Sequence, residues 1–174
     1  IPDFRSATGL YNQLTGSRYT PETMLSHIFF MLHPDEFYAF LRTSLYYPDA
    51  KPNAAHYALA EMEKQGKLNA VITQNIDGLH QLAGSKVVHE LHGSLERFYC
   101  VRCRHAFPAE QVYTQETTPR CEVCGGLVRP DVVLYGEQLN PDVLTASIDA
   151  IHNADCLIVG GSSLVVYPAA GLLD

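Results

Sequence analysis

The sequence predicts an α/β fold whose parallel sheet is interrupted by a small cysteine-rich insertion. Short apolar, strand-like runs alternate with segments whose apolar residues recur at helical spacing, which is the pattern of βαβ units. Between two of these runs, residues 97–130 hold four of the five cysteines together with many turn residues. The length of 174 residues corresponds to about one domain with a hydrophobic core.

Composition excludes several classes of protein. Lys and Arg number 12 against 19 Asp and Glu, and the net charge of −7 removes the attraction to a phosphate backbone, so we expect no direct nucleic-acid partner. Such an acidic surface is compatible with basic peptides as partners. No run reaches the ~18 uninterrupted apolar residues of a membrane helix, so we expect no membrane partner either.

The chain ends and the cysteines indicate the cellular compartment of the protein. The chain begins at Ile1 without Met and stops at Asp174 directly after an apolar run, so we expect a fragment of a longer protein. The sequence shows no signal peptide, a charged segment followed by an apolar one, that would indicate export. The cysteines are therefore interpreted as those of a cytoplasmic, reducing compartment, where metal binding is commoner than disulfide formation.

The first helices are predicted from capping residues and apolar spacing. Residues 1–19 lack a period and are expected to form a loop. A helix is expected over residues 20–32, because Thr20 can cap it and Pro21 suits its first turn. A second helix is expected over residues 35–44.

The remaining elements follow the same signals. Helices are expected over residues 53–65, with Ala55, Leu59 and Met62 facing inward, and over residues 142–152. Strands are expected over residues 69–73, 86–91, 131–135 and 156–159. Cys156 lies in the last of these strands and is interpreted as a small core residue.

The cysteine block predicts a zinc site. Cys100–Cys103 and Cys121–Cys124 are two Cys-x-x-Cys pairs separated by 17 residues, which is the spacing of a four-thiolate zinc ribbon. Four thiolates leave no open coordination position, so the zinc is expected to be structural. The alternative is a coincidental set of buried or redox-active cysteines.

Polar residues directly follow two of the predicted strands. In open α/β sheets, ligands bind beyond the carboxyl ends of the strands. Gln74-Asn75-Ile76-Asp77-Gly78 follows one strand and Gly160-Gly161-Ser162-Ser163 follows another. Each could be an ordinary turn, but together on one sheet they favour a nucleotide-type ligand.

His92 is the candidate acid or base. It follows the strand predicted over residues 86–91, and an unperturbed pKa near ~6.5 suits proton transfer near neutrality. A hydrogen-bonded structural role is the alternative for any one histidine, and it is preferred for His27, His33, His56, His105 and His152.

Several motifs, in matching order and spacing, resemble the sirtuin family. They are Ile1-Pro2-Asp3-Phe4-Arg5, residues 73–80 (Thr-Gln-Asn-Ile-Asp-Gly-Leu-His), residues 91–94 (Leu-His-Gly-Ser), the paired Cys-x-x-Cys, residues 133–137 (Val-Leu-Tyr-Gly-Glu) and residues 161–164 (Gly-Ser-Ser-Leu). The resemblance covers essentially the whole chain, which is identified as a member of the family with its subclass open.

The resemblance implies an NAD-dependent protein-lysine deacylase with two domains. A Rossmann-like domain would comprise residues 53–96 and 131–174. The smaller domain would comprise a helical module, residues 20–52, and the zinc ribbon, residues 97–130, while residues 1–19 would form the cofactor-binding loop. NAD and acyl-lysine would meet in the cleft between the domains.

The resemblance also implies roles for individual residues at the NAD site. Phe4 and Arg5 would lie on the cofactor-binding loop, with Phe4 shielding the nicotinamide side. Gln74 would contact the ribose, and Asn75 and Asp77 would line the nicotinamide and ribose pocket. The remaining cofactor-site residues are Ile76, beside them, and Gly161, Ser162 and Ser163 around the phosphate and ribose.

The family's chemistry explains these residue types. Nicotinamide leaves the ribose, and the acetyl oxygen attacks the cation-like carbon to give an alkylimidate. His92, counted as catalytic together with Asn75, would deprotonate a ribose hydroxyl that attacks the imidate. Water would then complete the release of lysine and acyl-ADP-ribose.

The acylated peptide is expected to add as a strand between residues 132–137 and residues 165–167. The residues assigned to it are Val132, Val133, Tyr135, Gly136, Glu137 and Val166. Val133 is expected to pack on the acyl-lysine stem. Sirtuins that remove acidic acyl groups carry Tyr-x-x-Arg, and here Leu41 follows Tyr38 at the position of that Arg, with Arg42 one position further on. Acetyl or apolar acyl groups are therefore expected.

Some departures and alternatives stay open. The Gly-Ala-Gly phosphate loop before Ile1 and the C-terminal adenine-binding segments of the family are absent, and Ser162 stands where many relatives have Thr. Mono-ADP-ribosyl transfer would use the same NAD cleavage with another acceptor. A zinc-stabilised peptide-binding module without catalysis is the alternative outside enzymes.

Overall fold

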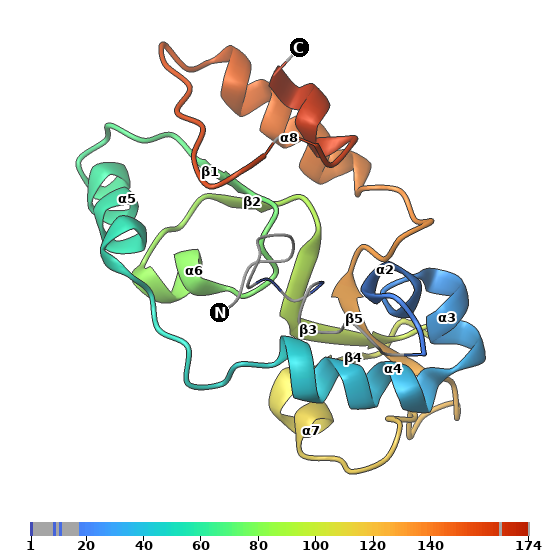
Figure 1. The fold of residues 1–174 in the computed structure, drawn as a ribbon. Coiled ribbons are helices and arrows are strands. Elements are labelled where there is room, and N and C mark those ends of the chain that lie inside the picture. The colour runs from blue at the N-terminus through green and yellow to red at the C-terminus, as the bar shows by residue number, and fades with distance from the viewer. Residues whose placement is uncertain (2–8, 10, 12–17, 164, 174) are drawn as a thin grey trace. The chain divides into compact units, whose positions relative to one another are not determined.

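The structure is a computed structural model that describes residues 1, 9, 11, 18–163 and 165–173 (Figure 1). The chain divides into two compact units. The first comprises residues 1–50 and 95–137, and the second comprises residues 51–94 and 138–174. The four cysteines of the predicted ribbon therefore lie in the first unit, and His92 lies in the second.

The first unit contains a three-stranded sheet with the strand order β4-β3-β5. Its strands are β3 (Gly93–Cys100), β4 (Ala106–Pro108) and β5 (Val128–Val132). Strands β3 and β4 pair in antiparallel fashion, with Phe98 opposite Phe107. The short helix α7 (Ala109–Tyr113) follows β4 directly.

The helical module of this unit is more divided than the sequence predicts. It contains α2 (Pro21–Met24), α3 (His27–Leu32), α4 (Pro34–Phe40) and the π-helical turn η1 (Leu41–Leu45). The single helix expected over residues 20–32 is wrong, because Ser26 begins a new helix by accepting a hydrogen bond from Phe29 N. The backbone on either side of Ser26 instead bonds to Tyr135, through Leu25 O and His27 N.

Aromatic side chains join the helices of the first unit to its sheet. The Tyr38 hydroxyl donates to Val128 O of β5 at 2.7 Å, and the Phe30 and Phe37 rings meet edge to face. The fully buried large side chains of the unit are Tyr38, Phe30, Phe37, Phe98, Leu41, Val112 and Val128. The buried aromatic side chains of the helices therefore hold β5 in place.

The second unit contains a two-stranded parallel sheet. Strands β1 (Val71–Thr73) and β2 (Val88–Glu90) pair in parallel, with Thr73 opposite Glu90. Its helices are α5 (Ala54–Lys64), α6 (Leu79–Ala83), α8 (Pro141–His152) and the 3₁₀ turn η2 (Ala169–Leu173). Helix α5 contacts α6, and α8 contacts β2.

Capping explains the helices that the sequence predicts correctly. Asn53 accepts hydrogen bonds from Ala55 N and His56 N at the start of α5, and Asn140 does the same for α8. The expected inward face of α5 is only partly right, because Ala55 is exposed while Leu59 and Met62 are half-buried.

Two strand predictions are wrong. The strand expected over residues 131–135 ends at Val132 and belongs to the three-stranded sheet, because residues 134–137 form a turn closed by Glu137 N and Leu134 O. Residues 156–159 have strand-like composition but join no strand in the described part of the chain. Ile158 is 74% exposed and Cys156 is exposed, so Cys156 is not a core residue here.

None of the helices within residues 18–163 and 165–173 combines the length and the apolar character that crossing a bilayer requires.

Candidate active site and metal centre

The parallel pairing of β1 and β2 brings His92 next to Gln74. Leu91 N donates to Thr73 O at 2.9 Å, so the two strands end side by side. The next residues, His92 and Gln74, are joined by a hydrogen bond of 3.0 Å between His92 Nδ1 and Gln74 O. Both residues directly follow the end of the parallel sheet, which is where ligands bind in open α/β folds.

This hydrogen bond fixes the tautomer of His92. A backbone carbonyl can only accept, so Nδ1 carries the proton and the lone pair of the neutral ring lies on Nε2. Burial lowers the His92 pKa, while the hydrogen bond to Gln74 partly opposes the shift. The neutral ring therefore dominates at pH 7, and Nε2 can act as a general base.

The turn after β1 places the other predicted cofactor residues. Asn75 is exposed, and its backbone N–H donates to Thr73 Oγ1 at 3.1 Å. Asp77 Oδ1 accepts from Leu79 N at 3.0 Å and so holds the first turn of α6. Gly78 has a φ of 69°, a left-handed conformation that favours glycine at this turn. Ile76 is half-buried between the two polar residues.

A second turn of the same unit lies against Gln74. The Gln74 side-chain amide donates to Ser162 Oγ at 3.4 Å, so the two polar segments predicted at strand ends are brought together. Gly161 has a φ of 66°, and Ser162 and Ser163 are exposed. Phe4 and Arg5, also predicted at the cofactor site, lie outside the described residues.

The predicted peptide-binding residues fall on both units. In the first unit, Val132 ends β5, Val133 is half-buried, and Tyr135 and Gly136 are exposed. Val166 is half-buried in the second unit. Glu137 differs from the others, because its carboxylate is bonded within the first unit to Arg129, His27 and Leu134 N.

Sequence reasoning missed Arg129. Its side chain is 7% exposed and pairs with Glu137. Burial acts to raise the pKa of Glu137, but the Arg129 guanidinium and the Leu134 N–H lower it to about 2. An arginine between Val128 and Pro130, followed by a glutamate eight residues later, is the signal that could have identified this pair. His27 was expected to be a hydrogen-bonded structural residue, and this is confirmed.

The four ribbon cysteines form a tight cluster. Their sulfur atoms all lie within 4.8 Å of one another, with 3.4 Å between Cys100 and Cys124 and 3.6 Å between Cys103 and Cys121. Tetrahedral zinc with bonds of about 2.3 Å to sulfur requires sulfurs about 3.8 Å apart. The cluster therefore fits one Zn²⁺ ion with four protein ligands.

The surrounding backbone is shaped for these sulfurs. A Cβ on Gly126 would lie 2.8 Å from Cys100 Sγ and 3.3 Å from Cys124 Sγ, so only glycine leaves them room. The Arg102 backbone N–H donates to Cys100 Sγ at 3.4 Å, and such a bond favours the thiolate, which is the form that binds the metal.

The fold and sites thus define an α/β protein with a zinc ribbon and a polar site at its strand ends. The chain belongs to the Sir2 family, whose family model matches residues 1–168. An "NAD-dependent protein deacetylase" of Clostridium acetobutylicum is 59% identical over 174 residues, which are 99% of this chain and 71% of that protein.

Solved Sir2 structures have the same fold. One, described with a deacetylated p53 peptide and 3′-O-acetyl-ADP-ribose, has a TM-score of 0.87 and 45% identity over 99% of this chain and 69% of that chain. Another, bound to a propionylated peptide, has a TM-score of 0.83 and 44% identity over 99% of this chain and 68% of that chain. The predicted family and fold class are confirmed.

Proposed function

We propose that this protein catalyses NAD-dependent removal of acetyl or apolar acyl groups from protein lysines. The products are nicotinamide, the deacylated lysine and O-acyl-ADP-ribose. The observation that carries the proposal is the His92–Gln74 hydrogen bond, which directs the basic Nε2 of His92 away from the backbone beside a turn rich in polar groups. Membership of a family with NAD-dependent deacetylases at 59% identity supports the cofactor and the reaction.

The residues of the second unit are proposed to have different roles at the NAD site. NAD supplies an ADP-ribosyl group that accepts the acyl oxygen as nicotinamide leaves. We assign His92 the removal of a proton from a ribose hydroxyl. Gln74, Asn75, Ile76 and Asp77 would bind the nicotinamide and ribose, and Gly161, Ser162 and Ser163 would bind the phosphate and its ribose. Phe4 and Arg5 are proposed for the same site, and Asn75 is also proposed as catalytic.

The peptide is proposed to bind by strand addition. The residues proposed for it are Val132, Val133, Tyr135, Gly136, Glu137 and Val166. In the described part of the chain, the backbone N–H and C=O of Val133 and Gly136 have no hydrogen-bond partner, so they are available to an extended peptide. The half-buried Val133 side chain suits contact with an uncharged acylated lysine.

Activity is expected to depend on pH through His92. The neutral ring is the active base, and burial lowers its pKa, so kcat/KM should rise with pH to a plateau with a midpoint below 6.5. Glu137, whose pKa is about 2, stays ionised throughout this range. Measuring kcat/KM from about pH 5 to about pH 8 tests the expectation. A midpoint above 6.5 would contradict it.

Succinyl-lysine is expected to be a poor substrate. Tyr38 and Leu41 are 0% and 1% exposed, so neither is placed to receive a carboxylate. Arg42 donates to the carbonyls of Glu116 and Thr117 at 3.2 and 2.7 Å, away from such a role. An unpaired carboxylate should lower kcat/KM at least roughly 100-fold relative to acetyl. Paired assays of acetyl- and succinyl-peptides of one sequence would show it, and equal rates would refute it.

Partner class and location follow from charge and cysteine chemistry. The net charge of −7 favours protein substrates over nucleic acid, and we propose neither nucleic-acid nor membrane partners. Four thiolates held for a metal persist best in a reducing compartment, so we propose a cytoplasmic location.

The test is mass spectrometry of an acetyl-lysine peptide incubated with the full-length protein, with and without NAD. Loss of the acetyl group only with NAD supports the proposal. Unchanged peptide with ADP-ribose attached to protein would favour mono-ADP-ribosyl transfer, the alternative that uses the same NAD cleavage. Unchanged peptide and unchanged NAD would favour the remaining alternative, a zinc-stabilised peptide-binding module without catalysis.

A further inference from the structure

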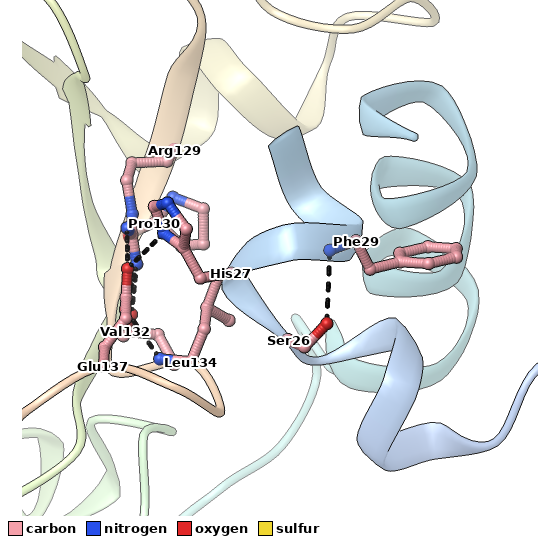
Figure 2. Close-up of polar contacts among 8 residues, drawn as sticks. All are labelled: Ser26, His27, Phe29, Arg129, Pro130, Val132, Leu134 and Glu137. Atoms are coloured by element: carbon pink, nitrogen blue, oxygen red, sulfur yellow. Dashed lines mark hydrogen bonds and ion pairs between the residues drawn. The ribbon is translucent and has the colours of Figure 1, made fainter. Parts of the chain in front are cut away.

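A buried ion pair holds the proposed peptide-binding segment, residues 132–137. Figure 2 shows Arg129 of β5 and Glu137 facing one another, with the His27 ring also directed at the carboxylate. Arg129 Nη2 donates to Glu137 Oε2 at 2.8 Å, and Arg129 Nη1 bonds to Oε1. The Arg129 side chain is 7% exposed and that of Glu137 is 21% exposed.

The same groups reach three points of the segment. Arg129 Nη2 also donates to Val132 O at 2.7 Å. Glu137 Oε2 accepts from Leu134 N at 2.8 Å, and His27 Nδ1 donates to Oε1 at 2.7 Å. One guanidinium and one carboxylate thereby connect Val132, Leu134 and Glu137, and His27 connects them to the start of α3 (Figure 2). We call Arg129, Glu137 and His27 the Arg129 clamp.

The clamp complements backbone bonds that shape the segment. Glu137 N donates to Leu134 O at 3.0 Å, and Gly136 has a φ of 90°, which completes a turn that requires glycine at this position. Tyr135 bonds through its backbone to Leu25 O and His27 N. The backbone groups of Leu134 and Tyr135 are therefore bonded within the first unit. Among the described residues, those of Val133 and Gly136 have no such partner and can bond to a bound peptide.

We propose that Arg129 is a positioning residue, which holds residues 132–137 in the conformation that receives the acyl-peptide backbone. The inference rests on the proposed function, and it goes beyond it by assigning substrate affinity to a residue that does not touch substrate. Buried ion pairs contribute little net stability compared with apolar packing of the same volume, but their directional bonds fix one conformation. A clamp bonded to three points of one short segment serves that purpose.

Two variants test the clamp with a matched control. Arg129→Lys retains the charge but loses the paired geometry, and His27→Ala removes the more exposed member, which is 46% exposed, with less risk to folding. Arg97→Gln is the control, because Arg97 forms an exposed pair with Asp131 on the same sheet at 2.9 Å. Acetyl-peptide Kd is measured by fluorescence anisotropy, and KM for peptide and for NAD by steady-state assay, in the full-length protein.

For Arg129→Lys the peptide Kd and KM should rise roughly tenfold, with the KM for NAD and the zinc content unchanged. His27→Ala should shift them in the same direction by less, and Arg97→Gln should leave them unchanged. Wild-type peptide affinity in both variants, even with a lower Tm, would overturn the inference and leave Arg129 a structural ion pair. If Arg129→Lys does not fold, the result for His27→Ala decides. Absence of NAD-dependent deacylation in the wild type would instead refute the proposed function, and the peptide Kd would still report on the clamp.

Discussion

Replacing His92 by alanine is expected to lower kcat/KM for deacylation by about 10²–10⁴-fold, the usual contribution of a general base. The ring is held by Gln74 O in the tautomer that leaves Nε2 basic, and alanine supplies no group that can take the proton. The measurement is the rate of acetyl-peptide turnover at pH 7 with saturating NAD.

The same variant separates the role of His92 from damage to the NAD site. His92 is assigned a step that follows nicotinamide release, so exchange of labelled nicotinamide into NAD should continue in His92→Ala. His152→Ala is the control, because His152 is exposed at the end of α8 and should leave both rates unchanged. Full deacylation by His92→Ala would contradict the assignment.

Replacing Cys121 by serine is expected to abolish zinc binding and unfold the ribbon. The structural zinc of small domains contributes about 10–16 kcal/mol to folding, so loss of one thiolate removes much of the stability of this region. Cys121 is 2% exposed, and its backbone carbonyl and N–H bond to Gly125 and Gly126. Zinc content by mass spectrometry and thermal unfolding by circular dichroism measure the effect.

A matched control is available within the chain. Cys156 is exposed and lies outside the four-sulfur cluster, so Cys156→Ser should keep one zinc per chain and the wild-type Tm. Because β5 follows the ribbon and carries Arg129, Cys121→Ser should also weaken binding of the acetyl-peptide. Normal zinc content and Tm in Cys121→Ser would mean that the cysteines are not the metal site.

Local chemistry made much of the fold predictable. Helices α5 and α8 begin where the Asn53 and Asn140 side chains accept hydrogen bonds from the first backbone N–H groups, and this local bonding holds whatever packs against the helix. The spacing of Cys100, Cys103, Cys121 and Cys124 likewise predicts a four-thiolate metal site from neighbouring residues alone. His92 could be placed because it directly follows the strand predicted over residues 86–91, and Gln74 could be placed because it directly follows β1.

The features that could not be predicted depend on contacts distant in sequence. The break at Ser26 arises because Leu25 and His27 bond to Tyr135, more than a hundred residues later. The apolar run over residues 156–159 predicts a strand, but a strand also needs a neighbour to bond to, and composition does not reveal one. Arg129 was missed because a buried arginine is explained only by its partner Glu137.

The most direct test of NAD-dependent deacylation by this protein is the stoichiometry of a single reaction. Acetyl-lysine peptide, NAD and the full-length protein are incubated together, and nicotinamide, deacetylated peptide and acetyl-ADP-ribose are quantified by liquid chromatography and mass spectrometry. NAD-dependent deacylation predicts that the three products appear in equal amounts. Free acetate released without consumption of NAD, or nicotinamide release without any acetyl-ADP-ribose, would contradict it.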